Sequence, residues 1–404
     1  MKELTTFILP RRYAAAPFDF DGESVSAAAV IPTYKPQTIT AQLVTDMVRW
    51  HPRVDVYVVD DCTPEESVES MLVIKGIRAT SSRVTLLRTP RNTLKAGALN
   101  LALRHMNTRG LSYDVVLTLD DDVVIDPLTV KNIVRELMSN DDLAAVCAQC
   151  RVLNKNKNLL TRLQALEYVG FNAVRLADEG FFKGPLVMPG MLTAFRAKAL
   201  SDVGGFAEGH LIEDYEITAR LKARGWSVKS ALTVSAWTVV PHTFSALWRQ
   251  RTRWSYGGIT VVLSARNFRS VLQDVLGHGI FIATVLMIAL LLLVRVDGSI
   301  PAAIAYWIIG ISFLQLFTWY AFNLWLMHLY REKDTLDWVI RTCVIPEFIY
   351  GNLMAAILIG SYLFLVFTTL KRSQTLHNPI MRTLVACGNW FFGAFGYADT
   401  WGGR

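Results

Sequence analysis

The chain has 404 residues, of which 52% are hydrophobic and 19% are charged, and its formal net charge is +7. This composition excludes a disordered protein and a small disulfide scaffold, and it is too apolar for an ordinary soluble enzyme. The first 274 residues contain 61 charged side chains and the last 130 contain 14, so the second region has half the charge density of the first. Two physically different regions therefore share one polypeptide.

The charge and cysteine patterns exclude two further classes of protein. No run of Lys and Arg is long enough to form a nucleic-acid-binding arm, so we expect no nucleic-acid partner. The five cysteines are odd in number and scattered, which suits a reducing compartment. Cys147 and Cys150 form a single C-x-x-C, but in a strand they would point to opposite faces. We therefore predict two buried residues rather than a metal or redox site.

The N-terminal segment, residues 1–26, carries no targeting signal that we can identify. It contains Arg11, Arg12 and several acids, and it has no apolar run as long as that of a signal peptide. We therefore expect the region that follows to begin on the cytoplasmic side.

Residues 27–240 alternate strand and helix patterns, as expected of a cytosolic α/β domain. Short apolar, β-branched runs predict four strands: Ser26–Thr33, Val54–Asp60, Val84–Leu87 and Val115–Leu119. Apolar residues recur at helical spacing in Gln37–Trp50 and in Lys95–Met106. Such alternation predicts parallel strands whose carboxyl ends collect the ligands. No G-x-G-x-x-G follows the first strand, which disfavours a dinucleotide-dependent oxidoreductase.

Three consecutive carboxylates, Asp120, Asp121 and Asp122, follow the fourth predicted strand. In an extended segment Asp120 and Asp122 face the same way, and their mutual repulsion favours a hard cation between them. Magnesium or manganese at this position would take its remaining ligands from a diphosphate. The alternative is a solvated acidic turn.

Two further segments carry functional groups. Glu213 and Asp214 precede an amphipathic stretch, where either could be a helix N-cap residue or the general base for an alcohol. Residues 241–270 contain LWRQRTRWSY, in which Gln250, Arg253 and Trp254 share a helix face. An amide, a guanidinium and an indole together can bind a diphosphate and stack on a sugar. A basic amphipathic helix at a membrane interface is the alternative reading.

Residues 271–370 predict about three transmembrane helices. Three stretches are almost free of charge and long enough to cross a bilayer: Val275–Val294, Ile300–Tyr330 and Thr342–Leu370. The third carries only Glu347, and Pro346 before it could break the helix.

The C-terminal tail, residues 371–404, bears on the orientation of these helices. Three crossings would leave Lys371, Arg372 and Arg382 outside, against the positive-inside tendency. Either the third stretch re-enters without crossing, or the short tail tolerates the violation.

These segments, in this order, resemble the family 2 glycosyltransferases, specifically the membrane-embedded branch that includes cellulose, chitin, hyaluronan and poly-N-acetylglucosamine synthases. The matching segments are VIPTYK, VVDDCTPE, KAGALN, LTLDDDVVIDP, MPGMLTAFR, IEDYEI and QRTRW. They extend from Val30 to Trp254, and the last contains a complete Q-x-x-R-W. The resemblance implies a GT-A-like (Rossmann-like) α/β domain with a mostly parallel sheet, followed by interfacial helices and an all-α transmembrane region.

The resemblance also implies roles for individual residues at the nucleotide. Thr33, Tyr34 and Asp60 would hold the uridine, with Asp61 a near-equal candidate for the role of Asp60. Lys95 in KAGALN would also lie at the nucleotide.

The remaining implied roles concern the reaction itself. Asp120 and Asp122 would bind the nucleotide diphosphate and its Mg²⁺ or Mn²⁺, and Asp214 would be the catalytic base. The donor diphosphate and the acceptor sugar would be bound by Gln250, Arg253 and Trp254.

The chain departs from this branch in three ways. Ile212 replaces the usual Thr before Glu-Asp, Gly190–Arg196 only loosely matches the Gly/Ser-rich acceptor segment, and the N-terminal membrane helices common in the branch are missing. Fewer helices leave open whether one protomer forms a complete polymer channel.

The resemblance implies an inverting, metal-dependent hexosyltransferase that moves a sugar from a UDP-sugar to a growing saccharide at the membrane. Membrane lipid, an oligomer or partner subunits would be further partners, and the plasma membrane is the expected location. One alternative is a single transfer to a polyprenyl phosphate or another lipid acceptor. An alternative of another class is a transporter or channel with a cytosolic regulatory domain.

Overall fold

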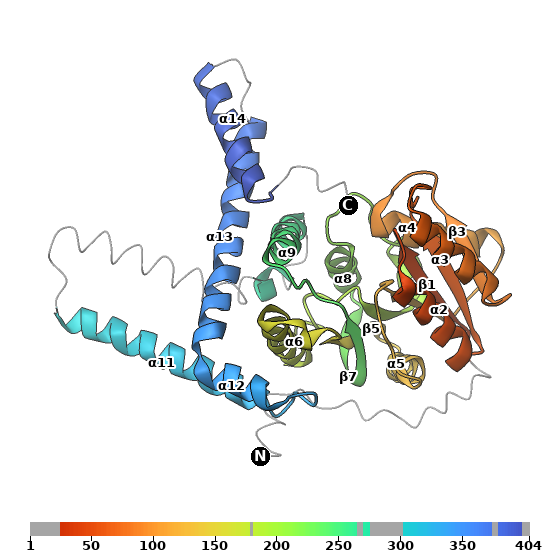
Figure 1. Cartoon of the computed structure of the whole chain (residues 1–404), viewed down its shortest axis with the longest axis horizontal. Helices are drawn as coiled ribbons and strands as arrows, with labels where there is room; N and C mark the ends of the chain where they lie inside the picture. The colour runs from red at the N-terminus through yellow and green to blue at the C-terminus, as the bar shows by residue number, and fades with distance from the viewer. Residues whose placement is uncertain (1–24, 178–180, 265–269, 275–301, 374–378, 398–404) are drawn as a thin grey trace.

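A computed structural model describes residues 25–177, 181–264, 270–274, 302–373 and 379–397 of the chain. Nearly all of the predicted N-terminal segment, and the whole apolar stretch Val275–Val294, lie outside these described residues. The described part forms an α/β domain followed by long helices that extend away from it (Figure 1).

The α/β domain is built on a seven-stranded sheet with the order β3-β2-β1-β4-β6-β5-β7. Neighbouring strands are parallel except at β6, which runs antiparallel to β4 and β5. The strands are β1 (Ala27–Thr33), β2 (Val54–Asp60), β3 (Val84–Arg88), β4 (Val115–Leu119), β5 (Leu143–Val152), β6 (Leu192–Arg196) and β7 (Ser227–Thr238). The predicted mostly parallel sheet is confirmed, and the four predicted strands match β1 to β4 to within one residue at each end.

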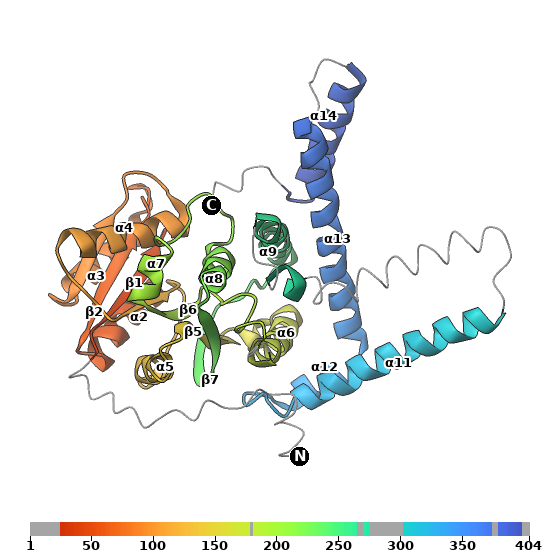
Figure 2. The ribbon, with the colours of Figure 1, turned by 180° about the vertical axis from the view of Figure 1, so that it is seen from behind.

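Helices cover both faces of the sheet. One face packs against α2 (Thr38–Trp50), α3 (Val68–Ala79), α5 (Thr129–Met138) and α6 (Leu159–Ala177), and the other against α4 (Leu94–Thr108), α7 (Ala197–Asp202) and α8 (Glu213–Ala223). The two cores form because successive side chains along a strand point to opposite faces. In β5, Cys147 belongs to one core and Cys150 to the other, and both are buried, as predicted. Figure 2 shows the same layers from behind.

The reversed strand β6 determines which edge of the sheet carries the polar loops. Because β6 is antiparallel to β4, the residues before β6 lie beside the residues that follow β4. The backbone N–H of Asp120 donates to the carbonyl of Met191 at 3.0 Å across this junction. The loops after β1, β2 and β4 therefore meet the loop before β6 at one edge.

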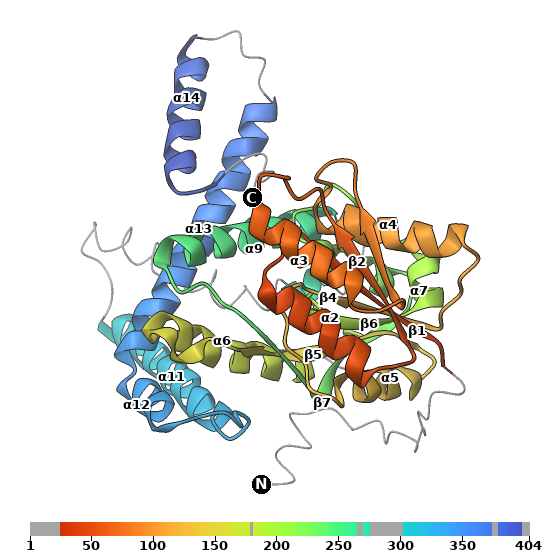
Figure 3. The same ribbon diagram turned by 45° about the vertical axis from the view of Figure 1, so that its right-hand side comes forward.

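The C-terminal part is helical. It comprises α9 (Phe244–Ser264), α11 (Ala302–Leu326), α12 (Thr335–Cys343), α13 (Ile345–Ser373) and α14 (Pro379–Ala394). Val344 adopts a φ of 61° between α12 and α13, and Pro346 follows in the first turn of α13. The stretch Thr342–Leu370 is thus broken next to Pro346, where a break had been considered from the sequence. Figure 3 shows α9 and α6 lying between the sheet and α13.

Helix α13 gives partial support to the predicted membrane region. Within the described residues, Ile345–Lys371 is the one helix identified as long and apolar enough to cross a membrane, and α14 packs beside α13. Helix α11 is free of charge over 25 residues and exposes large apolar side chains such as Trp307 and Phe313.

A buried ion cluster joins the α/β domain to α12. Lys155 lies 2.8 Å from Asp337, whose side chain is fully buried, and Arg162 contacts the other oxygen of Asp337 at 2.9 Å. Asp334 contacts both cations and caps α12 by accepting from the backbone N–H of Asp337. This cluster fixes the helices that follow α11 against the N-terminal end of α6.

Gly184 offers a test of the contact between the loop after α6 and the start of β7. Its φ is +104°, and a Cβ there would lie 1.7 Å from the carbonyl oxygen of Val228. We expect Gly184→Ala to destabilise the fold by at least about 3 kcal/mol, since both the backbone and the strand contact must change. Gly110→Ala is the control, because its φ is +66° with open space around it, and it should cost about 1 kcal/mol. Thermal unfolding in detergent would compare the two, and equal losses would contradict the contact.

Candidate active site

The three carboxylates after β4 each have a separate partner. Asp120 pairs with the Nζ of Lys95 at 2.6 Å, and Thr33 at the end of β1 donates to Asp121 at 2.5 Å. Asp122 accepts from the hydroxyl of Thr238 in β7 at 3.1 Å. Burial, together with repulsion from Asp120 and Asp121, raises the pKa of Asp122 to about 6.

The donor set at this turn suits a hard cation. Burial is the larger cause of the raised pKa of Asp122, and repulsion from Asp120 and Asp121 adds to it. A divalent ion would relieve that repulsion, and Asp120 and Asp122 offer oxygen ligands only. Among the residues that the structure describes, no group of three or more His, Cys, Asp or Glu is arranged to hold a metal. An ion at this turn would therefore need ligands from a bound phosphate or from water as well.

Two buried carboxylates close the end of β2. Asp60 accepts from the backbone N–H of Thr63 at 3.0 Å and lies 3.4 Å from the guanidinium of Arg88. Asp61 uses a single oxygen to accept from Thr89 and from both the backbone and the hydroxyl of Thr93, each at 2.8 Å.

Tyr34 is half-buried directly after β1, in the loop next to these carboxylates. The backbone N–H of Asp61 donates to the carbonyl of Thr33 at 2.8 Å, which ties this loop to the end of β2. Thr33, Tyr34, Asp60 and Asp61 therefore lie at one edge, as the sequence predicts.

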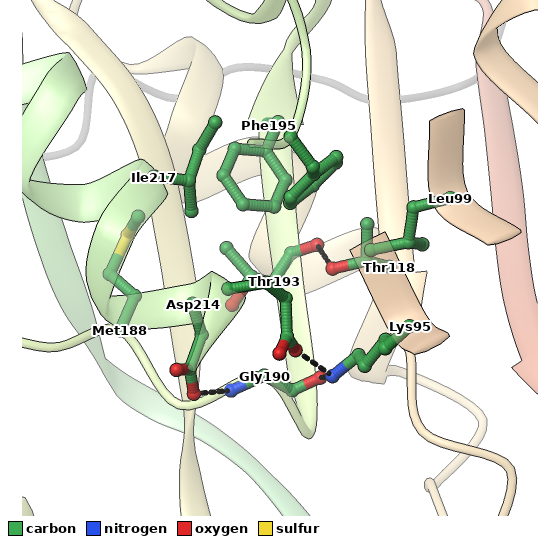
Figure 4. Close-up of a pocket in the computed structure, with 11 residues that line it drawn as sticks. Lys95, Leu99, Thr118, Met188, Gly190, Thr193, Phe195, Asp214 and Ile217 are labelled. Carbon is green, nitrogen blue, oxygen red and sulfur yellow. Dashed lines mark hydrogen bonds and ion pairs between the residues drawn. The ribbon is translucent and has the colours of Figure 1, made fainter. Parts of the chain in front are cut away.

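Lys95 connects the end of β4 to the start of α8. Figure 4 shows its ammonium group beside Gly190, whose backbone also contacts Asp214. The ammonium group of Lys95 lies 2.9 Å from Glu213 as well as 2.6 Å from Asp120, and it donates to the carbonyl of Gly190 at 3.0 Å. Burial would lower the pKa of Lys95, but Asp120, Glu213 and Asp214 hold it above its ordinary value. The lysine therefore stays charged throughout the physiological pH range.

Asp214 and Glu213 are adjacent but differ in ionisation. Burial would raise the pKa of Glu213, yet the attraction of Lys95 outweighs it and holds the pKa below its ordinary value. Burial and repulsion from Glu213 raise the pKa of Asp214 to about 6. Asp214 accepts from the backbone N–H groups of Gly190 at 2.9 Å and Tyr215 at 2.7 Å, which fix its orientation. Of the two, Asp214 is the better proton acceptor near neutral pH.

Helix α9 brings QRTRW to the start of α8. Gly257 leaves no room for a Cβ, since one there would lie 2.6 Å from the side chain of Ile212, whereas a Cβ at Gly258 would make ordinary contact with the ring of Tyr215 at 3.4 Å. Arg253, one turn earlier, is close enough for its charge to contribute to the low pKa of Glu213.

Gln250 and Trp254 lie on the same helix. The Oε1 atom of Gln250 is buried without a hydrogen-bond partner among the described residues, so it could accept from a bound hydroxyl. Trp254 is half-buried and packs partly against the core on the α6 side of the sheet.

Several residues that contribute contacts to this site are not indicated by any sequence pattern. Gly190 links Lys95 to Asp214 through its two backbone groups, and nothing in MPGMLTAFR marks that role. Thr238 is 116 residues from Asp122 and is brought near only by the pairing of β7. Arg251 lies inside QRTRW, but the Q-x-x-R-W pattern implies no role for it.

Comparison with known proteins finds enzymes that transfer or polymerise sugars. Residues 115–368 match the family model described as glycosyl transferase family group 2. The chain is 26% identical over 237 residues to a poly-β-1,6-N-acetyl-D-glucosamine synthase of Staphylococcus aureus (strain COL), which covers 59% of this chain and 55% of that protein. It is 30% identical over 182 residues to the synthase of the same description from Staphylococcus epidermidis, over 45% of this chain and 42% of that protein. The match thus spans about half the length of these curated relatives.

A solved structure shows the same fold. The mannosyltransferase PcManGT from Pyrobaculum calidifontis, in complex with GDP-Man and Mn²⁺, superposes with a TM-score of 0.55 at 19% identity, over 76% of this chain and 88% of that one. This likeness confirms a GT-A-like α/β fold.

Replacing Lys95 tests the charge balance at this edge. In Lys95→Met the carboxylates of Asp120, Glu213 and Asp214 lose their shared cation, so their mutual repulsion should destabilise the fold by about 3 kcal/mol at pH 8 and the pKa values of Glu213 and Asp214 should rise. The loss should shrink at pH 5, because Asp214, whose pKa is raised to about 6, then binds a proton in the folded state. Thermal unfolding at both pH values measures the difference. A loss that is the same at pH 5 and pH 8 would contradict the role of the ammonium group.

Proposed function

The chain belongs to glycosyl transferase family group 2, and on this premise we propose that it extends a saccharide at a membrane, using a UDP-sugar as donor and inverting the anomeric carbon. The observation that carries the proposal is the half-buried carboxylate of Asp214, held by two backbone N–H groups beside the ion pair of Lys95 and Glu213. The relatives named as poly-β-1,6-N-acetyl-D-glucosamine synthases favour N-acetylglucosamine as the sugar.

The donor nucleotide is proposed to bind at the carboxyl edge of the sheet. Thr33, Tyr34 and Asp60 would hold the uridine, with Asp61 able to take the place of Asp60, and Lys95 would lie at the nucleotide. They lie at or just after the carboxyl ends of β1 and β2, or at the start of the helix that follows β3, and this supports the assignment because ligands of open α/β sheets collect at such an edge.

The diphosphate is proposed to lie between the carboxylates after β4 and helix α9. Asp120 and Asp122 would hold Mg²⁺ or Mn²⁺, which when bound would offset the negative charge that develops on the leaving diphosphate. Arg253 and Gln250 would bind the diphosphate and an acceptor hydroxyl from the other side. The fixed charge of a guanidinium stabilises the leaving group without any reorganisation during the reaction.

In the proposed reaction Asp214 takes the proton of the acceptor hydroxyl. The hydroxyl oxygen forms a bond to the anomeric carbon as the bond from that carbon to the diphosphate oxygen breaks, so the configuration inverts. The nucleoside diphosphate leaves unprotonated, so no second carboxylate is needed as an acid. Glu213 is the weaker candidate for the base, because its pairing with Lys95 stabilises the ionised form.

Chain extension is preferred to a single transfer onto a polyprenyl phosphate. The complete Q-x-x-R-W in α9 and the polymer synthases among the relatives both favour an acceptor that is a saccharide. Membrane attachment through the C-terminal helices is supported by the length and composition of α13. Measuring the length of the product made from UDP-N-acetylglucosamine would separate the two acceptors.

The variant Asp214→Asn tests the base. Transfer should fall by about 10²-fold or more, while the affinity for UDP stays near that of the wild type, because the lost group acts on the acceptor proton. In the wild type, activity should decline as the pH falls through about 6, where Asp214 becomes protonated. Glu213→Gln is the matched control for the adjacent carboxylate. Transfer that survives in Asp214→Asn but is lost in Glu213→Gln, with UDP affinity retained, would assign the base to Glu213.

The variant Asp122→Asn tests the cation site. It should weaken the Mn²⁺-dependent binding of UDP by roughly tenfold or more and abolish transfer, because one of two proposed oxygen ligands loses its charge. Asp121→Asn is the control from the same tripeptide, since an amide oxygen can still accept from Thr33. Calorimetric titration with UDP, with and without Mn²⁺, measures the effect. Full activity in the presence of a chelator would refute the metal assignment.

A further inference from the structure

The indole of Trp254 contacts the charged side chain of Arg251 as well as apolar side chains of the core. The guanidinium carbon of Arg251 lies 4.3 Å from the centroid of the Trp254 ring, one helical turn earlier on α9. This distance is that of a stacked cation–π contact, which restricts the plane of the ring as well as its position.

Arg251 is itself held in place from two other helices. It is buried, and its Nη2 lies 2.5 Å from the carboxylate of Glu167 in α6. The hydroxyl of Tyr350 in α13 donates to the same carboxylate oxygen at 2.9 Å. The rings of Tyr168 and Phe171 lie 5.8 and 5.9 Å from the guanidinium carbon and complete the enclosure. Figure 3 shows the three helices that carry these residues, α6, α9 and α13, on the same side of the sheet.

The contacts form one continuous path from α13 to the indole. A buried ion pair with good geometry is rigid, since separating its members leaves a charge without a partner. A lysine at position 251 could keep the charge but could not keep both the planar stack and the directed bond to Glu167. The path thus depends on the shape of the guanidinium and not only on its charge.

We propose that Arg251 is a positioning residue for the acceptor: held by Glu167 and Tyr350, it fixes the plane of the Trp254 indole on which the acceptor sugar stacks, and it connects that stacking surface to α13. The proposal rests on the proposed function, in which Trp254 binds the acceptor. Its consequence is that a hydroxyl on α13, outside the α/β domain, affects acceptor binding.

The test uses the full-length enzyme in lipid nanodiscs, with UDP-N-acetylglucosamine as donor and a β-1,6-linked N-acetylglucosamine tetrasaccharide as acceptor probe. The variants are Tyr350→Phe and Arg251→Lys, and the readouts are the acceptor KM, kcat, donor hydrolysis without acceptor, and UDP affinity. We expect the acceptor KM to rise by about tenfold and the product to shorten, because the ring is no longer aligned. UDP affinity and donor hydrolysis should stay within about twofold, since the donor site is not on this path.

Tyr397→Phe is the matched control. Tyr397 is also buried, and its hydroxyl donates to a carbonyl of α13, that of Ile357, at 2.7 Å. Losing this hydroxyl removes a bond to α13 without touching Glu167 or Arg251, so the acceptor KM should stay within about twofold of the wild type. A KM that rises equally in Tyr397→Phe and Tyr350→Phe would mean that α13 acts on stability alone and would overturn the proposal.

A double-mutant comparison separates the proposal from the function on which it rests. If Arg251 acts through the indole, the double variant Arg251→Lys/Trp254→Ala should have the same acceptor KM as Trp254→Ala alone. If the two substitutions act independently, their effects on the KM would multiply, and the proposal would be overturned. If Trp254→Ala alone leaves the acceptor KM and product length normal, the acceptor role of Trp254 fails. If Trp254→Ala raises the KM but Tyr350→Phe and Arg251→Lys do not, only the positioning role fails. If Arg251→Lys does not fold, Tyr350→Phe alone tests the positioning role, because this substitution removes only the hydroxyl oxygen of Tyr350.

Discussion

The ammonium group of Lys95 lies between the carboxylate that ends β4 and the carboxylate that begins α8, and the arrangement of the site depends on it. Without a cation, the half-buried carboxylates of Asp120, Glu213 and Asp214 would repel one another. With it, Glu213 is stabilised as an anion while Asp214, which shares the burial but not the contact, keeps a raised pKa. One positive charge thus gives two neighbouring carboxylates different pKa values, low for Glu213 and raised for Asp214.

The second constraint is the close approach of α8 and α9. Gly257 lets α9 pass the N-terminal end of α8 at a distance that a side chain at this position would prevent. Ile212, which stands where the resembling family has Thr, fills the space that the missing Cβ of Gly257 leaves. The replacement of Thr by Ile212 is therefore accommodated by packing against α9, and QRTRW remains near Glu213 and Asp214.

Local patterns predicted most of the fold. The strands β1, β2 and β4 follow from short β-branched runs, and α2 and α4 follow from apolar residues at helical spacing, because both signals are carried within a few residues of sequence. The same patterns placed Asp60 and Asp120 at strand ends. They could not reveal β6, whose antiparallel direction depends on pairing with β4 some 75 residues earlier, as the partners Thr118 and Thr193 show. The ion pair of Glu167 and Arg251 was missed for the same reason, because its members are 84 residues apart.

The insertion of β6 between β4 and β5 also affects the order in which the domain can be assembled. During synthesis, β3, β2, β1 and β4 are complete long before residues 192–196 emerge, so the proposed nucleotide half can pair its strands while the chain is still growing. The edges of β4 and β5 that face β6 stay unpaired throughout that interval, and open edges are where chains aggregate. Gly190 and Asp214 arrive only with this second half. A nascent chain would therefore complete the proposed nucleotide-binding residues before it possesses the proposed base, and its unpaired strand edges would be covered before the proposed site is complete.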